Sequence, residues 1–322
     1  MRIMLLFGAG FFCLLFLSKP WPAHAASEYT DGPNATARAP IVRLKRESVD
    51  ELCVTRCQDK IAVVFIHGLF GSRETWLNVA TNAFWPHLIA SDDSFNHALD
   101  VYVVDYDSFL LRKGPSATQL RDEMAREIDA LLSKKYKQIV LIGHSLGGIL
   151  ARAYLLHVKT AFGHRALNSF GNTITLGSPG SGASIANLGR ILSANQQLRV
   201  LTPIEENDFQ QLLTSSWSDV DKKRLTRTHC DLLVTRAAYE TLETPPIGLV
   251  VSKASATVFS SVAKGFALTH EALAKPASMQ DELYKWVKEP ILECAKGTRS
   301  CGDGAQASCV EVDEPPSNPR SR

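Results

Sequence analysis

Short apolar runs alternate with stretches of helical periodicity through the middle of the chain. The apolar runs contain many β-branched residues and therefore predict strands that are buried on both faces. They lie at residues 61–66, 100–104, 138–142, 173–176, 231–235 and 247–251. Alternation of this kind predicts an α/β fold, in which a mostly parallel sheet is covered by helices on both faces.

Three further segments place apolar residues at helical spacing. One helix is expected to be capped by Ser116, a second runs from Leu146 through Val158, and a third surrounds Trp286 near the end of the chain. Ligands of parallel α/β sheets bind beyond the carboxyl ends of the strands. Functional residues are therefore expected just after the strands.

The third apolar run leads directly into Gly143-His144-Ser145-Leu146-Gly147, which matches the pattern G-x-S-x-G. The pattern alone is weak, but a strand before it and a helix after it form the setting that a nucleophile elbow requires. In that setting the turn presents the hydroxyl of Ser145, and the backbone N–H of Leu146 can face an oxyanion. Ser145 is therefore predicted to be a catalytic nucleophile, and the alternative is a serine in an ordinary tight turn.

A second glycine-containing loop, His67-Gly68-Leu69-Phe70, follows the first apolar run. Acyl transfer needs a second donor for the oxyanion, and a loop after the first core strand can supply a backbone N–H. Leu69 is the expected donor, with Phe70 as the next choice. We expect His67, Gly68, Phe70 and His144 to line the substrate-binding site.

The catalytic base is expected to be a histidine after Ser145, because the chain order in this fold is serine, acid, histidine. His157 lies about three turns along the helix that follows the elbow. His164 and His229 precede strands, which puts them at the opposite edge of the sheet. His270 follows the last apolar run and precedes the final helix, so it is the predicted base.

These motifs resemble those of the α/β-hydrolase superfamily, which implies the α/β-hydrolase fold. The later part of the chain is similar to a narrower serine-esterase branch, which includes the GPI-inositol-deacylase-like and phospholipid-remodelling-type proteins. The residues that carry this second resemblance are 238–241, 250–256, His270, 275–276 and Tyr284. The resemblance spans residues 60 to 290, but the branch often has a glutamate where this chain has Ala254.

The carboxylate that orients the histidine should follow a late strand and precede His270. Glu240 and Glu243 both follow the run at 231–235 and both are candidates. Glu240 is closer to the strand, and the resembling branch carries a Glu-Thr pair at this place, so Glu240 is the preferred assignment. The alternative is a glutamate on a surface loop.

The first 25 residues have the layout of a secretory signal peptide. Arg2 precedes an apolar run at 3–17, and Ala23-His24-Ala25 is a small-residue cleavage pattern. The chain is therefore expected to be secreted or periplasmic, with cleavage after Ala25. The alternative is an uncleaved membrane anchor, for which this run is short, because a span needs about 20 apolar residues.

Six cysteines remain after cleavage, and an even number in an exported chain predicts up to three disulfides. The economical local pairs are Cys53–Cys57 and a pair among the last three cysteines. Free thiols and a zinc site are the alternatives, but the cysteine spacings fit no zinc signature, so no metal site is predicted. The six residues are Cys53, Cys57, Cys230, Cys294, Cys301 and Cys309.

The chain is expected to contain one large domain between two extensions. Residues 1–25 are the signal peptide, 26–59 a leader with Cys53 and Cys57, 60–297 the hydrolase domain and 298–322 a cysteine-containing flexible tail. Within the domain, an insertion at about 180–229 carries apolar residues in the pattern of a helical lid over an apolar substrate, and ordinary core helices are the alternative.

Charge excludes one class of partner. Removal of Arg2 and Lys19 with the signal peptide leaves 35 − 2 = 33 basic residues against 33 acidic ones, so no electrostatic case exists for nucleic-acid binding. The sequence as a whole predicts an exported serine hydrolase of carboxylic esters that needs no cofactor. Its expected partners are a small-molecule or lipid ester and, through the lid, a membrane surface. An acyltransferase with the same site and a non-catalytic binding protein on the same fold are the alternatives.

Overall fold

Seven strands form one sheet, and every neighbouring pair runs parallel. The computed structural model describes residues 41–44, 60–69, 71–104, 117–180, 215–217, 234–245 and 248–296. The predicted signal peptide, the predicted C-terminal tail and nearly all of the predicted lid-like insertion therefore lie outside the described residues. In spatial order the strands are β1 (Ile41–Leu44), β5 (Leu99–Val104), β2 (Ile61–Ile66), β6 (Gln138–His144), β7 (Phe170–Leu176), β8 (Val234–Glu240) and β9 (Val262–Phe266).

The carboxyl ends of the central strands meet at one edge of the sheet. Ile66 of β2 pairs with Gly143 of β6, and His144 pairs with Leu176 of β7. The last residues of β8 and β9, Glu240 and Phe266, pair with each other. The segments that follow β2, β6, β7 and β8 are therefore brought to this edge, where the functional residues are expected.

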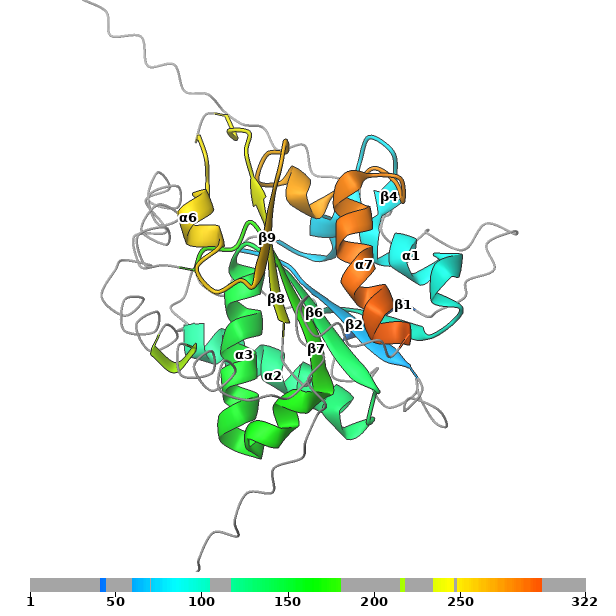
Figure 1. The fold of residues 1–322 in the computed structure, drawn as a ribbon, viewed down its shortest axis with the longest axis vertical. Helices are drawn as coiled ribbons and strands as arrows, with labels where there is room; N and C mark the ends of the chain where they lie inside the picture. Colours follow the sequence, from blue (N-terminus) through cyan, green and yellow to red (C-terminus); the bar gives the residue numbers. More distant parts are fainter. Residues whose placement is uncertain are drawn as a thin grey trace, which may run out of the picture. The chain divides into compact units, whose positions relative to one another are not determined.

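Helices cover both faces of the sheet (Figure 1). One face packs on α2 (Ala117–Ser133) and α3 (Leu146–Phe162). The other packs on α1 (Trp85–Ala90) and α7 (Glu282–Lys296). The remaining elements are short: η2 (Arg73–Trp76), the hairpin of β3 (Leu77–Asn78) and β4 (Ala83–Phe84), η3 (Asp93–Phe95), η5 (His164–Ser169), α6 (Lys253–Ala256) and η7 (Ala272–Ala274).

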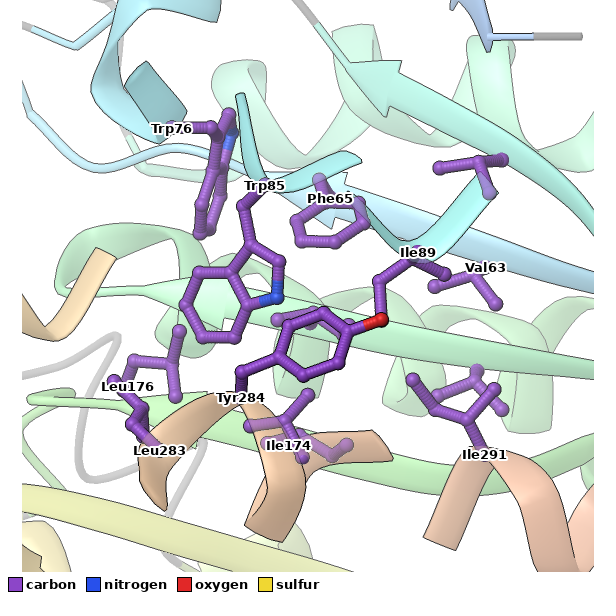
Figure 2. Close-up of a cluster of buried hydrophobic side chains, with 14 of the residues drawn as sticks. Val63, Phe65, Trp76, Trp85, Ile89, Ile174, Leu176, Leu283, Tyr284 and Ile291 are labelled. Carbon is purple, nitrogen blue, oxygen red and sulfur yellow. The ribbon is translucent and has the colours of Figure 1, made fainter. Parts of the chain in front are cut away.

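The core on the α1 and α7 side is dense in aromatic residues (Figure 2). Phe65 of β2 meets Trp76 and Trp85 edge to face, with ring centroids 4.9 and 6.1 Å apart. Such pairs add about 0.5–1.5 kcal/mol each beyond the apolar area that they bury. Tyr284 of α7 lies in the same cluster and donates its hydroxyl to Asp92, so the last helix is fixed to the first half of the domain.

The predicted α/β class and four of the predicted strands are confirmed, in β2, β5, β6 and β7. The fifth extends further than predicted, because β8 continues to Glu240. The sixth prediction, a strand at 247–251, is wrong. Gly248 has a φ of +83°, which interrupts an extended chain, and its pairing with Thr244 is an isolated bridge.

Two edge strands were not predicted from the sequence. β9 contains Lys264 and Gly265, which break the apolar pattern, and its first residues are exposed. At the other edge, β1 pairs with β5 from within the segment that the sequence analysis assigns to the leader. An edge strand is paired on one side only, so it needs less apolar sequence than a central strand.

Cys294 of α7 is a free thiol that is buried. The sequence predicts up to three disulfides, and a free Cys294 excludes the full set of three as well as any local pair that includes Cys294. The other five cysteines that follow residue 25, and with them the predicted Cys53–Cys57 pair, lie outside the described residues. Within the part of the chain that the structure describes, no helix is both long and apolar enough to span a membrane.

Candidate active site

Ser145 occupies a sharp turn between β6 and α3. Its φ of 53° and ψ of −122° are unusual for a residue with a side chain, and strain of this kind occurs at functional sites. Its backbone N–H donates to the carbonyl oxygen of Leu176 at 2.9 Å, which ties the turn to the end of β7. Since Leu146 is the first residue of α3, its N–H has no acceptor within the helix. This is the geometry that the sequence predicts for a nucleophile elbow.

The glycines around Ser145 are required by close contacts. A Cβ atom on Gly147 would lie 2.1 Å from the carbonyl oxygen of Ile66, and one on Gly143 would lie 2.5 Å from the backbone of Gly148. A Cβ atom on Gly148 would lie 2.0 Å from Oγ of Ser178. The start of α3 is therefore in direct contact with the end of β2 and with the segment that follows β7.

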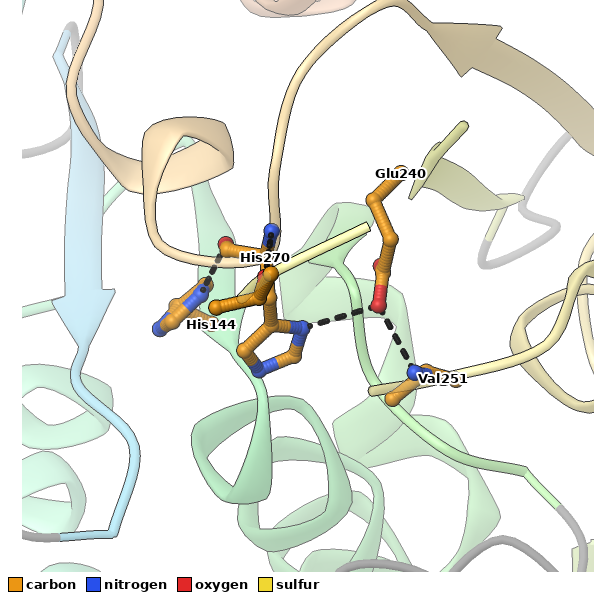
Figure 3. Close-up of polar contacts among 5 residues, drawn as sticks. His144, Glu240, Val251 and His270 are labelled. Atoms are coloured by element: carbon orange, nitrogen blue, oxygen red, sulfur yellow. Dashed lines mark hydrogen bonds and ion pairs between the residues drawn. The ribbon is translucent and has the colours of Figure 1, made fainter. Parts of the chain in front are cut away.

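His270 and Glu240 form a buried pair at the same edge (Figure 3). Nδ1 of His270 lies 3.2 Å from Oε1 of Glu240. An ionised carboxylate only accepts hydrogen bonds, so Nδ1 carries the proton and Nε2 keeps its lone pair. Glu243, the other candidate acid, is exposed.

The carboxylate of Glu240 is held through its Oε1 atom. Its Oε1 atom also accepts the backbone N–H of Val251 at 2.7 Å (Figure 3), and its Oε2 atom is buried without a hydrogen-bond partner in the part of the chain that the structure describes. Gly177, which has a φ of +56°, faces the pair: a Cβ atom there would lie 2.9 Å from Nδ1 of His270 and 3.1 Å from Oε2 of Glu240. A side chain at position 177 would therefore disturb the pair directly.

The backbone of His270 is held on both sides. Its N–H donates to Oγ1 of Thr244 at 3.2 Å, and its carbonyl oxygen accepts Nε2–H of His144 at 3.0 Å. The two imidazole rings have centroids 4.9 Å apart. Burial, with a smaller effect of His270, lowers the pKa of His144 to about 3, so this ring is neutral at ordinary pH.

The loop after β2 approaches the elbow closely. A Cβ atom on Gly68 would lie 2.9 Å from Cβ of Ser145. Leu69, the expected oxyanion donor, follows directly, whereas Phe70 lies outside the described residues. His67 is completely buried and its Nδ1 is 2.9 Å from the carbonyl oxygen of Gly68. His67 and His144, which were expected to line the substrate site, are thus packed inside the protein.

The last residue of β7 and the residue after it connect the turn at Ser145 to the His270–Glu240 pair. Leu176 accepts the N–H of Ser145, and the next residue, Gly177, lies against His270 and Glu240. The other histidines that follow Ser145 in the chain are not part of this pair. His157 lies on α3, with its Nε2 atom 3.9 Å from Oδ2 of Asp129 on α2. His164 begins η5 before β7, and His229 lies outside the described residues.

Sequence reasoning did not identify Gly177, Thr244 and Val251 as parts of the site. Gly177 comes directly after the predicted strand at 173–176, and this position alone would have placed it at the functional edge of the sheet. Thr244 and Val251 contribute one hydrogen bond each through long-range contacts that no local pattern indicates. Across the described ranges, no group of three or more His, Cys, Asp or Glu side chains is arranged to hold a metal ion.

Comparison with known proteins gives one family match. The sequence profile described as PGAP1-like alpha/beta domain matches residues 58–267. No curated protein matches the chain.

Several solved structures are similar to the chain at low identity. The lipase BlEst2 of Bacillus licheniformis, in its mature form, is 18% identical over 73% of this chain and 92% of that chain, with a TM-score of 0.45. A lipase-esterase related protein of Clostridium acetobutylicum is 15% identical over 74% and 96% of the two chains, with a TM-score of 0.41. The RedJ thioesterase of Streptomyces coelicolor is 14% identical over 71% and 85%, with a TM-score of 0.41.

Proposed function

The chain belongs to the family of PGAP1-like alpha/beta domains, and from that premise we propose that it is a serine hydrolase that cleaves carboxylic esters through an acyl-enzyme on Ser145. One observation carries the proposal. A strained serine turn and a buried His270–Glu240 pair lie at the same edge of the sheet, and consecutive residues, Leu176 and Gly177, contact the first and the second.

In the proposed reaction, Nε2 of His270 removes the proton from the hydroxyl of Ser145 as its oxygen attacks the ester carbonyl. Glu240 holds the imidazole in the required tautomer and stabilises its charged form. The backbone N–H groups of Leu69 and Leu146 donate to the oxyanion of the tetrahedral intermediate. The histidine then protonates the leaving alcohol. Water next attacks the carbonyl of the acyl-enzyme while Nε2 of His270 takes its proton, and His270 returns that proton to the oxygen of Ser145 as the bond to the acyl group breaks.

We further propose that the ester is apolar or lipid. The apolar positions of the insertion at 180–229 support an acyl-chain or lipid substrate, and a membrane surface is the place where such a substrate would be met. The signal-like residues 1–25 support export to a secreted or periplasmic location. N-terminal sequencing of the exported protein should then begin at Ala26, and a protein that begins at Met1 would contradict cleavage.

Purified mature protein assayed on p-nitrophenyl esters of rising acyl-chain length tests the proposal. Ser145→Ala should lower kcat by at least about a thousandfold and abolish labelling by a fluorophosphonate probe, because the nucleophile is lost. Ser133→Ala, at the end of α2, is the matched control and should behave as wild type. If Ser145→Ala keeps near wild-type activity, the proposed mechanism is wrong.

Two further outcomes would redirect the proposal. Wild-type protein that neither hydrolyses esters nor reacts with the probe would indicate a non-catalytic binding protein. Transfer of the acyl group to an added alcohol in preference to water would indicate an acyltransferase, because the two classes differ only in what resolves the acyl-enzyme.

A further inference from the structure

The imidazole of His144 lies between the loop after β2 and the segment that carries His270. A Cβ atom on Gly68 would lie 3.5 Å from Nδ1 of His144, and Nε2 of His144 is 3.0 Å from the carbonyl oxygen of His270. The ring also meets Trp76 edge to face. Only 7% of His144 is exposed, so the residue next to the nucleophile is enclosed by the parts of the proposed site rather than open to a substrate.

The hydrogen bond to His270 defines the tautomer of His144. A carbonyl oxygen only accepts, so Nε2 of His144 must carry the proton and Nδ1 must be the unprotonated nitrogen. The burial that lowers the pKa of this ring to about 3 keeps it in the neutral form. His144 therefore does not exchange protons with a substrate at ordinary pH. It acts instead as a hydrogen-bond donor to the backbone of His270.

We propose that His144 is a positioning residue for His270: its Nε2–H fixes the carbonyl of the base to the residue that precedes the nucleophile. The inference rests on the proposed function, and it replaces substrate binding as the role of His144. The pattern G-x-S-x-G allows any residue at position 144. The hydrogen bond to His270 explains why a histidine is useful there in this chain.

Three hydrogen bonds hold His270, two from the end of β8 and the turn after it and one from the end of β6. Thr244 accepts its N–H, Glu240 accepts its Nδ1–H, and His144 donates to its carbonyl oxygen. Of these, the contact from His144 alone comes from the residue adjacent to Ser145. Loss of it would let the base move relative to the nucleophile, and a displacement of about 1 Å costs on the order of a hundredfold in rate.

The test compares His144→Gln with His144→Met in ester hydrolysis. Glutamine keeps an N–H donor at a similar reach, and methionine has no donor but fills similar space. His144→Met should lower kcat by about 10- to 100-fold, should change KM by less than about threefold, and should slow fluorophosphonate labelling in proportion. His144→Gln should restore kcat to within about fivefold of wild type. His157→Met, on the outer part of α3, is the matched control and should leave both constants unchanged.

Equal activity of the methionine and glutamine variants would overturn the inference, whether both are active or both are impaired. If His144→Met does not fold, His144→Asn takes its place, because its amide is too short to reach His270. His144→Asn should then lower kcat by about 10- to 100-fold, as expected for His144→Met. Equal kcat values for His144→Asn and His144→Gln would also overturn the inference. Absence of hydrolysis and labelling in the wild type would instead defeat the proposed function, so the two failures are distinguishable.

Discussion

Glu240 and His270 meet through Oε1 and Nδ1 at 3.2 Å, although 30 residues separate them in the chain. The contact depends on where β8 ends. Because β8 continues to Glu240, the carboxylate stands at the edge of the sheet, and the turn after β9 brings His270 to the same place. The same oxygen, Oε1, also accepts the backbone N–H of Val251, so Glu240 keeps a hydrogen bond that does not depend on His270.

Glu240→Gln should lower kcat by about 10²- to 10⁴-fold, because a neutral amide does not stabilise the charged imidazole and can select the wrong tautomer. The melting temperature should change little, since the amide can still accept the N–H of Val251. Glu243→Gln, an exposed residue three positions along, is the matched control and should keep wild-type kcat. Steady-state kinetics and thermal unfolding of both variants check this, and a silent Glu240→Gln beside a crippled Glu243→Gln would reverse the assignment.

Gly177→Ala should damage both stability and activity. Its φ of +56° costs an L-residue about 1–2 kcal/mol, and the new Cβ atom would lie 2.9 Å from Nδ1 of His270. Gly163→Ala separates the two effects, because Gly163 has a φ of +81° but no atom within 4 Å of the added Cβ. Both variants should lose stability in urea unfolding, but only Gly177→Ala should lose more than about tenfold in kcat per folded molecule. Similar kcat values for the two would show that position 177 matters for folding alone.

The central strands and the elbow follow from local sequence. A short run such as Ile61–Ile66, apolar on both faces and rich in β-branched residues, is typical of a buried strand in a parallel sheet. A glycine-rich turn between such a strand and a helix is the setting of a nucleophile elbow. The prediction of His270 as the base stays consistent with the fold even though the expected last strand is wrong. β9 ends at the same edge of the sheet, so His270 still follows the last strand.

Other features depend on contacts that no local pattern contains. The apolar residues Val250 and Val251 look like a strand, but they pack beside Ala256 in a small cluster of their own, and the N–H of Val251 binds Glu240 instead of a neighbouring strand. Likewise, the sequence places His144 beside Ser145 but cannot tell whether its ring points to a substrate or to the backbone of a residue 126 positions away.

The free thiol of Cys294 sets the number of thiols that we expect in the proposed mature form, which lacks residues 1–25. With Cys294 free, at most two disulfides can form among the other five cysteines, so a monomer should show at least 6 − 4 = 2 thiols after denaturation without reductant. Burial raises the pKa of the Cys294 thiol, so this residue should react slowly with a thiol reagent in the native state. Cys294→Ala should remove one thiol from the count in denaturant. A denatured monomer without any free thiol would contradict the structure of this helix.

The lowered pKa of His144 predicts how the free energy of unfolding changes with pH. In the folded state its pKa is lowered to about 3, chiefly by burial, whereas an unfolded histidine titrates near 6.5. Between these values the unfolded chain binds more protons than the folded one, so the free energy of unfolding must fall as the pH falls below 6.5. The groups that face the ring, His270, Lys275 and His67, act in the same direction as burial, and only the hydrogen bond to the carbonyl of His270 opposes them.

The expected loss from His144 between pH 7 and pH 5 is about 2 kcal/mol in the free energy of unfolding. Because glutamine does not titrate, His144→Gln should reduce the difference between urea-unfolding free energies at the two pH values by about that amount. His157→Gln is the control, since His157 lies on the outer part of α3 and its side chain is 28% exposed. If the acid sensitivity of His144→Gln equals that of wild type, protonation of the unfolded His144 does not contribute, and the ring is not held in its neutral, buried state.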